Sequence, residues 1–200
     1  MGLYGIVVCG GKSARMGTDK SKLVYYNQPQ HDHVYQLLAP FCEKTFISCN
    51  ADQYQHMETV YEKIPDMLHY EGHGPISALL TAFETFPNQD FLIIGCDYPF
   101  LKSTDLEVFL SSIRKDSLAA AFYNQDHKYE PLLAWYSWQC AEQLNALFQE
   151  ERYALQSFLR NVNAAKFVPE TPDAMKSVDT PEDFLWVKET LKTENRAGNE

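Results

Sequence analysis

VVCGGKSARMGTDK, residues Val7–Lys20, is the most informative stretch of this 200-residue chain. It overlaps an apolar run, Leu3–Val8, that predicts a buried strand. The eleven residues from Gly10 to Lys20 hold three glycines, two lysines and one arginine. Glycines let backbone N–H groups approach an anion closely, and the cations neutralise phosphate charge. A strand that opens into such a loop predicts a nucleotide site near the start of an α/β domain.

The spacing of the glycines excludes two common nucleotide loops. A P-loop needs a glycine five positions before Gly11, the glycine of its Gly-Lys-Ser, and that position is Ile6. The dinucleotide fingerprint Gly-x-Gly-x-x-Gly does not fit glycines at 10, 11 and 17. The plain alternative is a glycine-rich turn whose charges are solvated.

Apolar periodicity along the rest of the chain predicts strands that alternate with helices. The expected strands are Leu3–Val8, Thr45–Cys49, Lys63–Asp66, Phe91–Gly95, Leu118–Tyr123, Tyr129–Trp135 and Ala165–Val168. The expected helices are His33–Phe41, Gln53–Glu62, Gly74–Phe86, Thr104–Arg114, Trp138–Phe148, Ala154–Leu159 and Pro181–Leu191. This order predicts a three-layer α/β/α fold with a mostly parallel twisted sheet, to which the pair within 118–135 adds an antiparallel element. We expect one domain over residues 1–191 and a polar, disordered tail over 192–200.

Composition limits the partners and the compartment. The formal net charge of −10 would repel nucleic acid and anionic membranes, and no apolar run approaches the ~20 residues that span a bilayer. We therefore expect neither a nucleic-acid nor a membrane partner. The five cysteines form no Cys-x-x-Cys pair, which predicts reduced thiols and, with no signal peptide visible, a cytoplasmic protein. We expect His31, His33, His69 and His73 to be solvated surface residues.

Asp97 follows the apolar run Phe91–Gly95, in the segment Gly95-Cys96-Asp97-Tyr98-Pro99. Ligands of open parallel sheets bind beyond the carboxyl ends of the strands. A carboxylate there can hold Mg²⁺, which takes the rest of its ligands from water and substrate phosphates. The alternative is an aspartate that merely caps a turn.

The pattern Gly-Gly-x-Ser-x-Arg-Met-Gly-x-Asp-Lys over residues 10–20 resembles the signature loop of the sugar-nucleotide-transferase-like nucleotidyltransferases. Within them it looks most like the molybdenum cofactor guanylyltransferases, and the resemblance runs from Gly5 to Phe184. It implies a Mg²⁺-dependent enzyme that moves GMP from GTP to the phosphate of molybdopterin and releases pyrophosphate. The resemblance also implies protein partners, either proteins of cofactor synthesis or the molybdoenzymes that accept the cofactor.

The resemblance assigns roles to individual residues. Those implied for nucleotide binding are Val8, Cys9, Gly10, Gly11, Lys20, Asn50, Asp66, Gly74 and Asp97. Backbone N–H groups of Cys9–Lys12 would cradle the triphosphate. Arg15, Lys20 and Asp97 would be the catalytic residues: the two cations stabilise phosphate charge, and Asp97 binds the metal.

Three of these residues have a plain structural alternative to their implied role in nucleotide binding. Asn50 matches a family asparagine that touches the nucleotide, but it can equally cap the next helix. Asp66 matches a family aspartate that binds guanosine, although by itself it is a surface turn residue. Gly74 precedes a helix in Gly-Pro-Ile-Ser-Ala, where the family has Gly-Pro-Leu-Ala-Gly, and an ordinary turn explains it equally well.

The acceptor side departs from the family pattern. The family ends in Asn-Val-Asn-Thr-Pro-Glu-Asp, and this chain has Ser177 and Asp179 at the two asparagine positions. These two residues are the expected acceptor contacts, and whether Asp179 is a second Mg²⁺ ligand stays open. An aspartate at that place is more typical of related cytidylyltransferases, so a molybdopterin cytidylyltransferase, or a transferase with another base or acceptor, is one alternative. A nucleotide-binding protein that catalyses nothing is the other.

Overall fold

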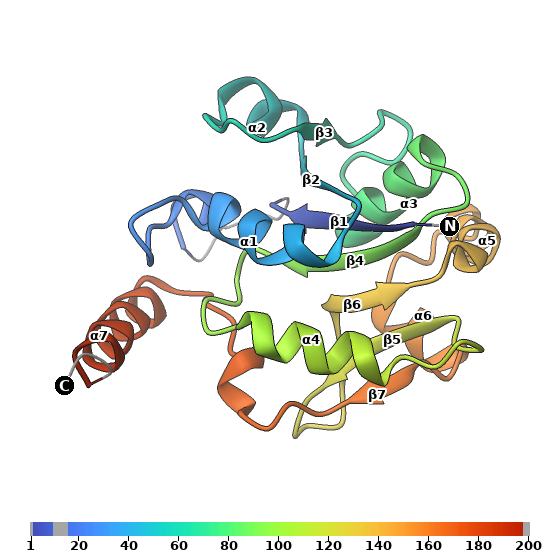
Figure 1. Cartoon of the computed structure of the whole chain (residues 1–200). Coiled ribbons are helices and arrows are strands. Elements are labelled where there is room, and N and C mark those ends of the chain that lie inside the picture. The colour runs from blue at the N-terminus through green and yellow to red at the C-terminus, as the bar shows by residue number, and fades with distance from the viewer. Residues whose placement is uncertain (1, 10–15, 198–200) are drawn as a thin grey trace.

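The sheet places the amino-terminal strand in the middle of the protein. A computed structural model describes residues 2–9 and 16–197, and in that part of the chain the sheet has seven strands in the order β3-β2-β1-β4-β6-β5-β7 (Figure 1). Strands β3, β2, β1 and β4 run parallel, β6 is antiparallel to both β4 and β5, and β7 is parallel to β5. The predicted mostly parallel α/β architecture is therefore confirmed.

The elements follow the predicted alternation. The strands are β1 (Leu3–Val8), β2 (Lys44–Cys49), β3 (Lys63–Pro65), β4 (Asp90–Gly95), β5 (Ala119–Tyr123), β6 (Tyr129–Tyr136) and β7 (Ala165–Phe167). The α-helices are α1 (Gln30–Leu38), α2 (Ala51–His56), α3 (Pro75–Thr85), α4 (Ser103–Ser112), α5 (Ala141–Gln149), α6 (Leu155–Asn161) and α7 (Pro181–Ala197). Short 3-10 helices lie at Lys20–Lys22, Ala39–Phe41, Trp138–Cys140 and Pro172–Met175.

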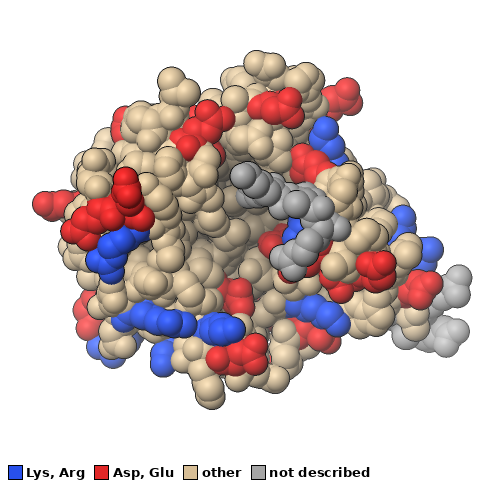
Figure 2. Space-filling view, turned by 180° about the vertical axis from the view of Figure 1, so that it is seen from behind, with Lys and Arg blue, Asp and Glu red and all other residues tan. Residues whose placement is uncertain are grey.

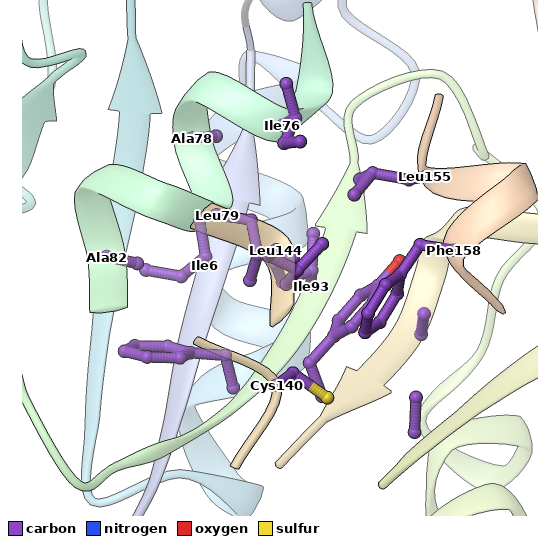
Figure 3. Close-up of a cluster of buried hydrophobic side chains, with 14 of the residues drawn as sticks. Ile6, Ile76, Ala78, Leu79, Ala82, Ile93, Cys140, Leu144, Leu155 and Phe158 are labelled. Carbon is purple, nitrogen blue, oxygen red and sulfur yellow. The ribbon is translucent and has the colours of Figure 1, made fainter. Parts of the chain in front are cut away.

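Two apolar cores form because alternate residues of the central strands point to opposite faces of the sheet. Ile6 and Ile93 face α3, α5 and α6, and Figure 3 shows them among Leu79, Leu144 and Phe158. The opposite face, which includes Val7 and Ile94, packs against α1 and α4. Helices thus cover both faces of the sheet, as the three-layer prediction requires (Figure 1).

Helix α2 differs from its predicted range, Gln53–Glu62. It begins at Ala51 because Asn50 and Gln53 form a capping box, and it ends at His56. The backbone of the next residue, Met57, is extended, and the Lys63 ammonium donates to the carbonyl oxygens of Tyr54 and Met57 at 2.7 and 2.9 Å. These bonds satisfy carbonyl groups at the helix end.

The carboxyl-terminal helix is longer than its sequence suggests. Helix α7 continues past Leu191 to Ala197, so the predicted disordered tail begins within a helix, and residues 198–200 lie outside the described part of the chain. Val187 and Leu191 pack in a third cluster with Met16 and Phe100. Across residues 2–9 and 16–197, we find no helix with both the length and the apolar character needed to cross a membrane.

Candidate nucleotide-binding site

One edge of the sheet collects the polar residues that follow the parallel strands. Strands β1, β2, β3 and β4 end at Val8, Cys49, Pro65 and Gly95, and their parallel pairing brings these ends together. Asn50, Asp66 and Asp97 follow three of them directly or within two residues. The sequence motifs therefore meet at one edge, where ligands of open α/β sheets bind.

A pocket of about 710 Å³ opens at this edge. It is lined by Val8, Ser48, Asn50, Ala51, Asp52, Asp66, Glu71, Gly72, Gly74 and Ala78. Four of the residues predicted to bind nucleotide are thus brought into one cavity, whose volume suits a small organic ligand. Seen from behind, the molecule is hollowed near its centre, with acidic and basic side chains at the border of the hollow (Figure 2).

Asp66 gives this pocket an acidic wall. Burial raises the pKa of its carboxyl group to about 6, and the nearby charge of Glu71 adds to this rise. A hydrogen bond from the Ser48 hydroxyl, at 3.3 Å, lowers the pKa and so opposes the effect of burial. A half-buried carboxylate with spare acceptor capacity can receive N–H donors from a ligand.

Asn50 and Gly74 both serve the backbone at helix starts. The Asn50 Oδ1 accepts the Gln53 N–H at 2.8 Å, so the capping interpretation of this residue is confirmed, while it also lines the pocket. Gly74 precedes α3 with φ +77°, a conformation that L side chains rarely adopt. A side chain there would strain the turn that borders the pocket.

Asp97 lies just past β4, two residues after Gly95, which pairs with the pocket-lining Val8 of β1. Its Oδ1 atom is buried and has no hydrogen-bond partner among the described residues. Burial raises the pKa of this carboxyl group to about 6, and the nearby Lys20 charge opposes that rise. A Cβ on Gly95 would come within 2.7 Å of Oδ1, so a larger residue at position 95 would displace this side chain from its place.

Lys20 and the segment 177–179 reach Asp97 from distant parts of the chain. The Lys20 ammonium lies 2.5 Å from Asp179 Oδ1, across 159 residues of sequence. Between Ser177 and Asp179, the Val178 N–H donates to the Asp97 carbonyl oxygen at 2.9 Å. Lys20, Asp97 and Asp179 therefore form one charged cluster, and Ser177 is adjacent to it.

The cluster fits a divalent cation held jointly with a substrate. Asp97 offers an unpartnered buried oxygen, and Asp179 is close enough to raise the pKa of Asp97. Within residues 2–9 and 16–197, no three Cys, His, Asp or Glu side chains gather into a metal site of their own. Any Mg²⁺ bound here would therefore depend on water and phosphate oxygens for most of its ligands.

Sequence patterns missed several residues of this edge. Asp19 accepts the Ser21 N–H and hydroxyl at 3.0 and 2.7 Å and so caps the turn that bears Lys20. Glu130 of β6 receives hydrogen bonds from the Tyr98 hydroxyl and the Asn124 amide. The Asn50-x-x-Gln53 spacing was a usable signal for the capping box, whereas no local pattern points to Glu130.

One backbone group and two histidines have surroundings that the sequence did not predict. The Cys9 N–H, predicted to help cradle the triphosphate, donates to the Ser48 carbonyl oxygen at 3.0 Å, and its contact with a phosphate stays a prediction. His31 is 2% exposed rather than solvated, with its Nδ1 2.7 Å from the Ser21 carbonyl oxygen. His33 is also half-buried, and desolvation lowers its pKa.

The cysteines match the expectation of free thiols. All five are unpaired with one another as disulfides, although Cys9 Sγ lies 3.1 Å from Cys96 Sγ in the core. Burial raises the pKa of Cys9 well above its usual value. Gly10, Gly11 and Arg15, the remaining predicted site residues, lie outside the described part of the chain.

Known proteins share both the sequence and the fold. The chain is 33% identical over 184 residues to a molybdenum cofactor biosynthesis bifunctional protein of Synechocystis sp., covering 91% of this chain but only 52% of that protein. It is 25% identical to a probable molybdenum cofactor guanylyltransferase of Bacillus mycoides, over 95% of this chain and 98% of the relative.

A solved structure shows the same fold. The molybdopterin-guanine dinucleotide biosynthesis protein A of Archaeoglobus fulgidus superposes with a TM-score of 0.78 at 21% identity, over 95% of this chain and 99% of that one. The model of the MobA-like NTP transferase domain matches residues 5–166. The chain therefore belongs to the family of MobA-like NTP transferase domains.

Proposed function

We propose that this protein transfers GMP from GTP to the phosphate of molybdopterin and releases pyrophosphate. The observation that carries the proposal is the adjacency of an acid-lined pocket and the cluster of Lys20, Asp97 and Asp179 at one edge of the sheet. A nucleotide with its base in the pocket would direct its phosphates toward that cluster. A relative that is named a probable molybdenum cofactor guanylyltransferase, and that aligns over nearly its whole length, supports the same substrate.

Guanine suits the acids of the pocket. Its N1–H and 2-amino groups are adjacent donors, and a carboxylate can accept both through its two oxygens. Asp66 is the half-buried carboxylate best placed for this role, and Asp52 and Glu71 also line the pocket. Cytosine and adenine offer only an exocyclic amine, beside an acceptor nitrogen that a carboxylate repels.

The transfer needs positioning and charge neutralisation more than covalent help. The phosphate of the acceptor is ionised near pH 7, so it can attack without a general base. Lys20 would stabilise negative charge on the phosphates, and Asp97, with Asp179 as the second candidate ligand, would hold Mg²⁺. The metal, when bound, would add further screening of phosphate charge. Ser177 and Asp179 would face the acceptor.

The second candidate function is cytidylyl transfer. Asp179 favours it, because an aspartate at this position is more typical of related cytidylyltransferases. The guanylyl proposal keeps priority because of Asp66 in the pocket and the Gly10-Gly11 and Asp19-Lys20 pairs.

The proposal also includes a cytoplasmic location. Its proposed partners are the proteins that make the cofactor or receive it.

Calorimetry with GTP, CTP, ATP and UTP tests the proposed substrate, each with Mg²⁺ and with a chelator. We expect GTP to bind at least about tenfold more tightly than the others, a difference of about 1.4 kcal/mol. Product formation from GTP and molybdopterin would then be measured as the release of pyrophosphate. A preference for CTP would support the cytidylyl function, and GTP binding without product would indicate a non-catalytic protein.

Guanine binding is expected to weaken in acid because of Asp66. The free carboxyl group has a pKa of about 6, and only its ionised form accepts the two N–H donors of guanine. Protons therefore compete with the base below that pH. The dissociation constant of guanosine should be constant above about pH 7 and rise by up to about tenfold per unit below pH 6. The ligand is guanosine, used without metal, because it has no phosphate group that would itself titrate in this pH range.

Asp66→Asn is the decisive variant for this effect. It should weaken guanosine binding at pH 7.5 and remove the pH dependence, since the amide does not titrate between pH 5 and 8. Asp126→Asn, on the exposed hairpin between β5 and β6, makes the same charge change away from the pocket and should leave both unchanged. The same pH dependence in Asp66→Asn as in the natural protein would contradict the role of Asp66.

A further inference from the structure

Gln53 joins parts of the site that are far apart in the chain. It occupies the third position of α2, where its Oε1 accepts the Asn50 N–H at 3.2 Å as one half of the capping box. The other half is the bond from the Gln53 N–H to Asn50 Oδ1. A capping box uses only the side-chain oxygen of this residue, so its amide group has two further hydrogens to donate.

Both hydrogens have partners across the site. The Gln53 Nε2 lies 3.1 Å from the carbonyl oxygen of Cys9, the residue after β1, and 2.9 Å from Asp19 Oδ2. Gln53 as a whole is only 8% exposed, so water competes little for these bonds. One amide therefore connects the end of β1, the start of α2 and Asp19.

Asp19 transmits this connection to Lys20. Its other oxygen, Oδ1, accepts the N–H and the hydroxyl of Ser21, and the Ser21 carbonyl oxygen is held in turn by buried His31 of α1. Both neighbours of Lys20 are thus fixed by hydrogen bonds. These bonds fix the backbone at Lys20. They therefore also limit where the Lys20 ammonium group, which pairs with Asp179, can lie.

We infer that Gln53 is a positioning residue for the transfer step, because it fixes the turn that bears Lys20 relative to α2, whose first residues line the base pocket. The inference rests on the proposed function, in which Lys20 stabilises phosphate charge. Glutamate has almost the same shape and keeps the oxygen for Asn50, but it donates nothing and would place a second carboxylate against Asp19. Glutamine is therefore required for its hydrogens as well as its size.

Gln53→Glu tests the inference, and Gln55→Glu is its matched control, with the same charge change on an exposed position of the same helix. Turnover is measured by pyrophosphate release from GTP with Mg²⁺ and molybdopterin. Misplacing a catalytic charge by about 1 Å costs about 10²-fold, so we expect kcat to fall by about that factor. The KM for GTP should change by less than about threefold, because the base pocket keeps its capped helix.

Two double variants separate positioning from a general loss of structure. In the Lys20→Ala background, Gln53→Glu should lower kcat by less than about twofold more, because residues that act as a unit are not additive. Asp19→Asn combined with Gln53→Glu reverses the hydrogen bond, since the amide at residue 19 then donates to the carboxylate at residue 53. This pair should recover at least part of the lost kcat.

Hydrogen exchange over residues 16–26 gives a measurement that needs no substrate. Gln53→Glu should speed exchange at the Ser21 N–H, which Asp19 protects, while Gln55→Glu leaves it unchanged. Full turnover in Gln53→Glu, a full additive loss in the Lys20→Ala background, or unchanged exchange would each overturn the inference. A normal kcat for Lys20→Ala, or no product from the natural protein, would instead contradict the proposed function, and exchange would then decide the role of Gln53.

Discussion

Replacing Asp97 by asparagine should lower Mg²⁺-dependent turnover by about 10³-fold or more. The carboxylate is the proposed metal ligand, and metal-assisted charge stabilisation is worth several kcal/mol, or a factor of ten for each 1.36 kcal/mol. Asparagine has the same shape, so it fits over Gly95 where the Asp97 side chain lies. The measurement is initial rate against Mg²⁺ concentration at saturating GTP, with Asp126→Asn as the matched exposed control.

Folding and function can be separated in this variant. Burial raises the folded-state pKa of Asp97 from 3.8 to about 6, so the unfolded chain ionises first. The stability from the neutral acid is complete below pH 3.8 and is lost as the pH rises to about 6. Asparagine stays neutral, and we therefore expect the melting temperature of Asp97→Asn at pH 7 to equal or exceed that of the natural protein.

Retention of normal Mg²⁺ dependence in Asp97→Asn would move the metal site elsewhere. The same titration on Asp179→Asn addresses the second candidate ligand. A rise of about tenfold in the Mg²⁺ concentration for half-maximal rate would support metal binding by Asp179. An unchanged midpoint would contradict metal binding by Asp179.

Lys20→Ala is expected to lower kcat by about 10²-fold, the scale of losing one donor that stabilises transition-state charge. Its ammonium lies in the cluster with Asp97 and Asp179, and the Lys20 side chain is only 20% exposed. Turnover is measured at saturating GTP and Mg²⁺, so that weaker binding does not enter the comparison.

Lys22→Ala provides the control for this experiment. Lys22 belongs to the same 3-10 turn but is exposed, so its removal changes the net charge equally without touching the cluster. Its kcat should stay within about twofold of the natural value, as for most surface substitutions. Equal losses in the two variants would mean that total charge, and not the place of Lys20, sets the rate.

Local sequence was sufficient for most of the fold. The apolar runs of β1 and β4 and the apolar face of α3 are contiguous or periodic, and such patterns depend on neighbouring residues alone. The end of α2 was missed because the bonds from Lys63 to the carbonyl oxygens at its end come from a residue beyond the predicted helix. His31 was misplaced because its burial depends on the turn at Ser21 packing over α1.

Local sequence patterns were enough to predict the order of strands and helices and the position of Asp97 after a buried strand. The folded chain reveals which distant residues meet at this edge of the sheet: Asp179 with Lys20, Val178 with Asp97, and Gln53 with Asp19. The physical reason is the central place of β1 in the sheet. Parallel pairing with β2 and β4 brings the ends of separate chain segments to one edge, and no local pattern records which neighbours a strand will have.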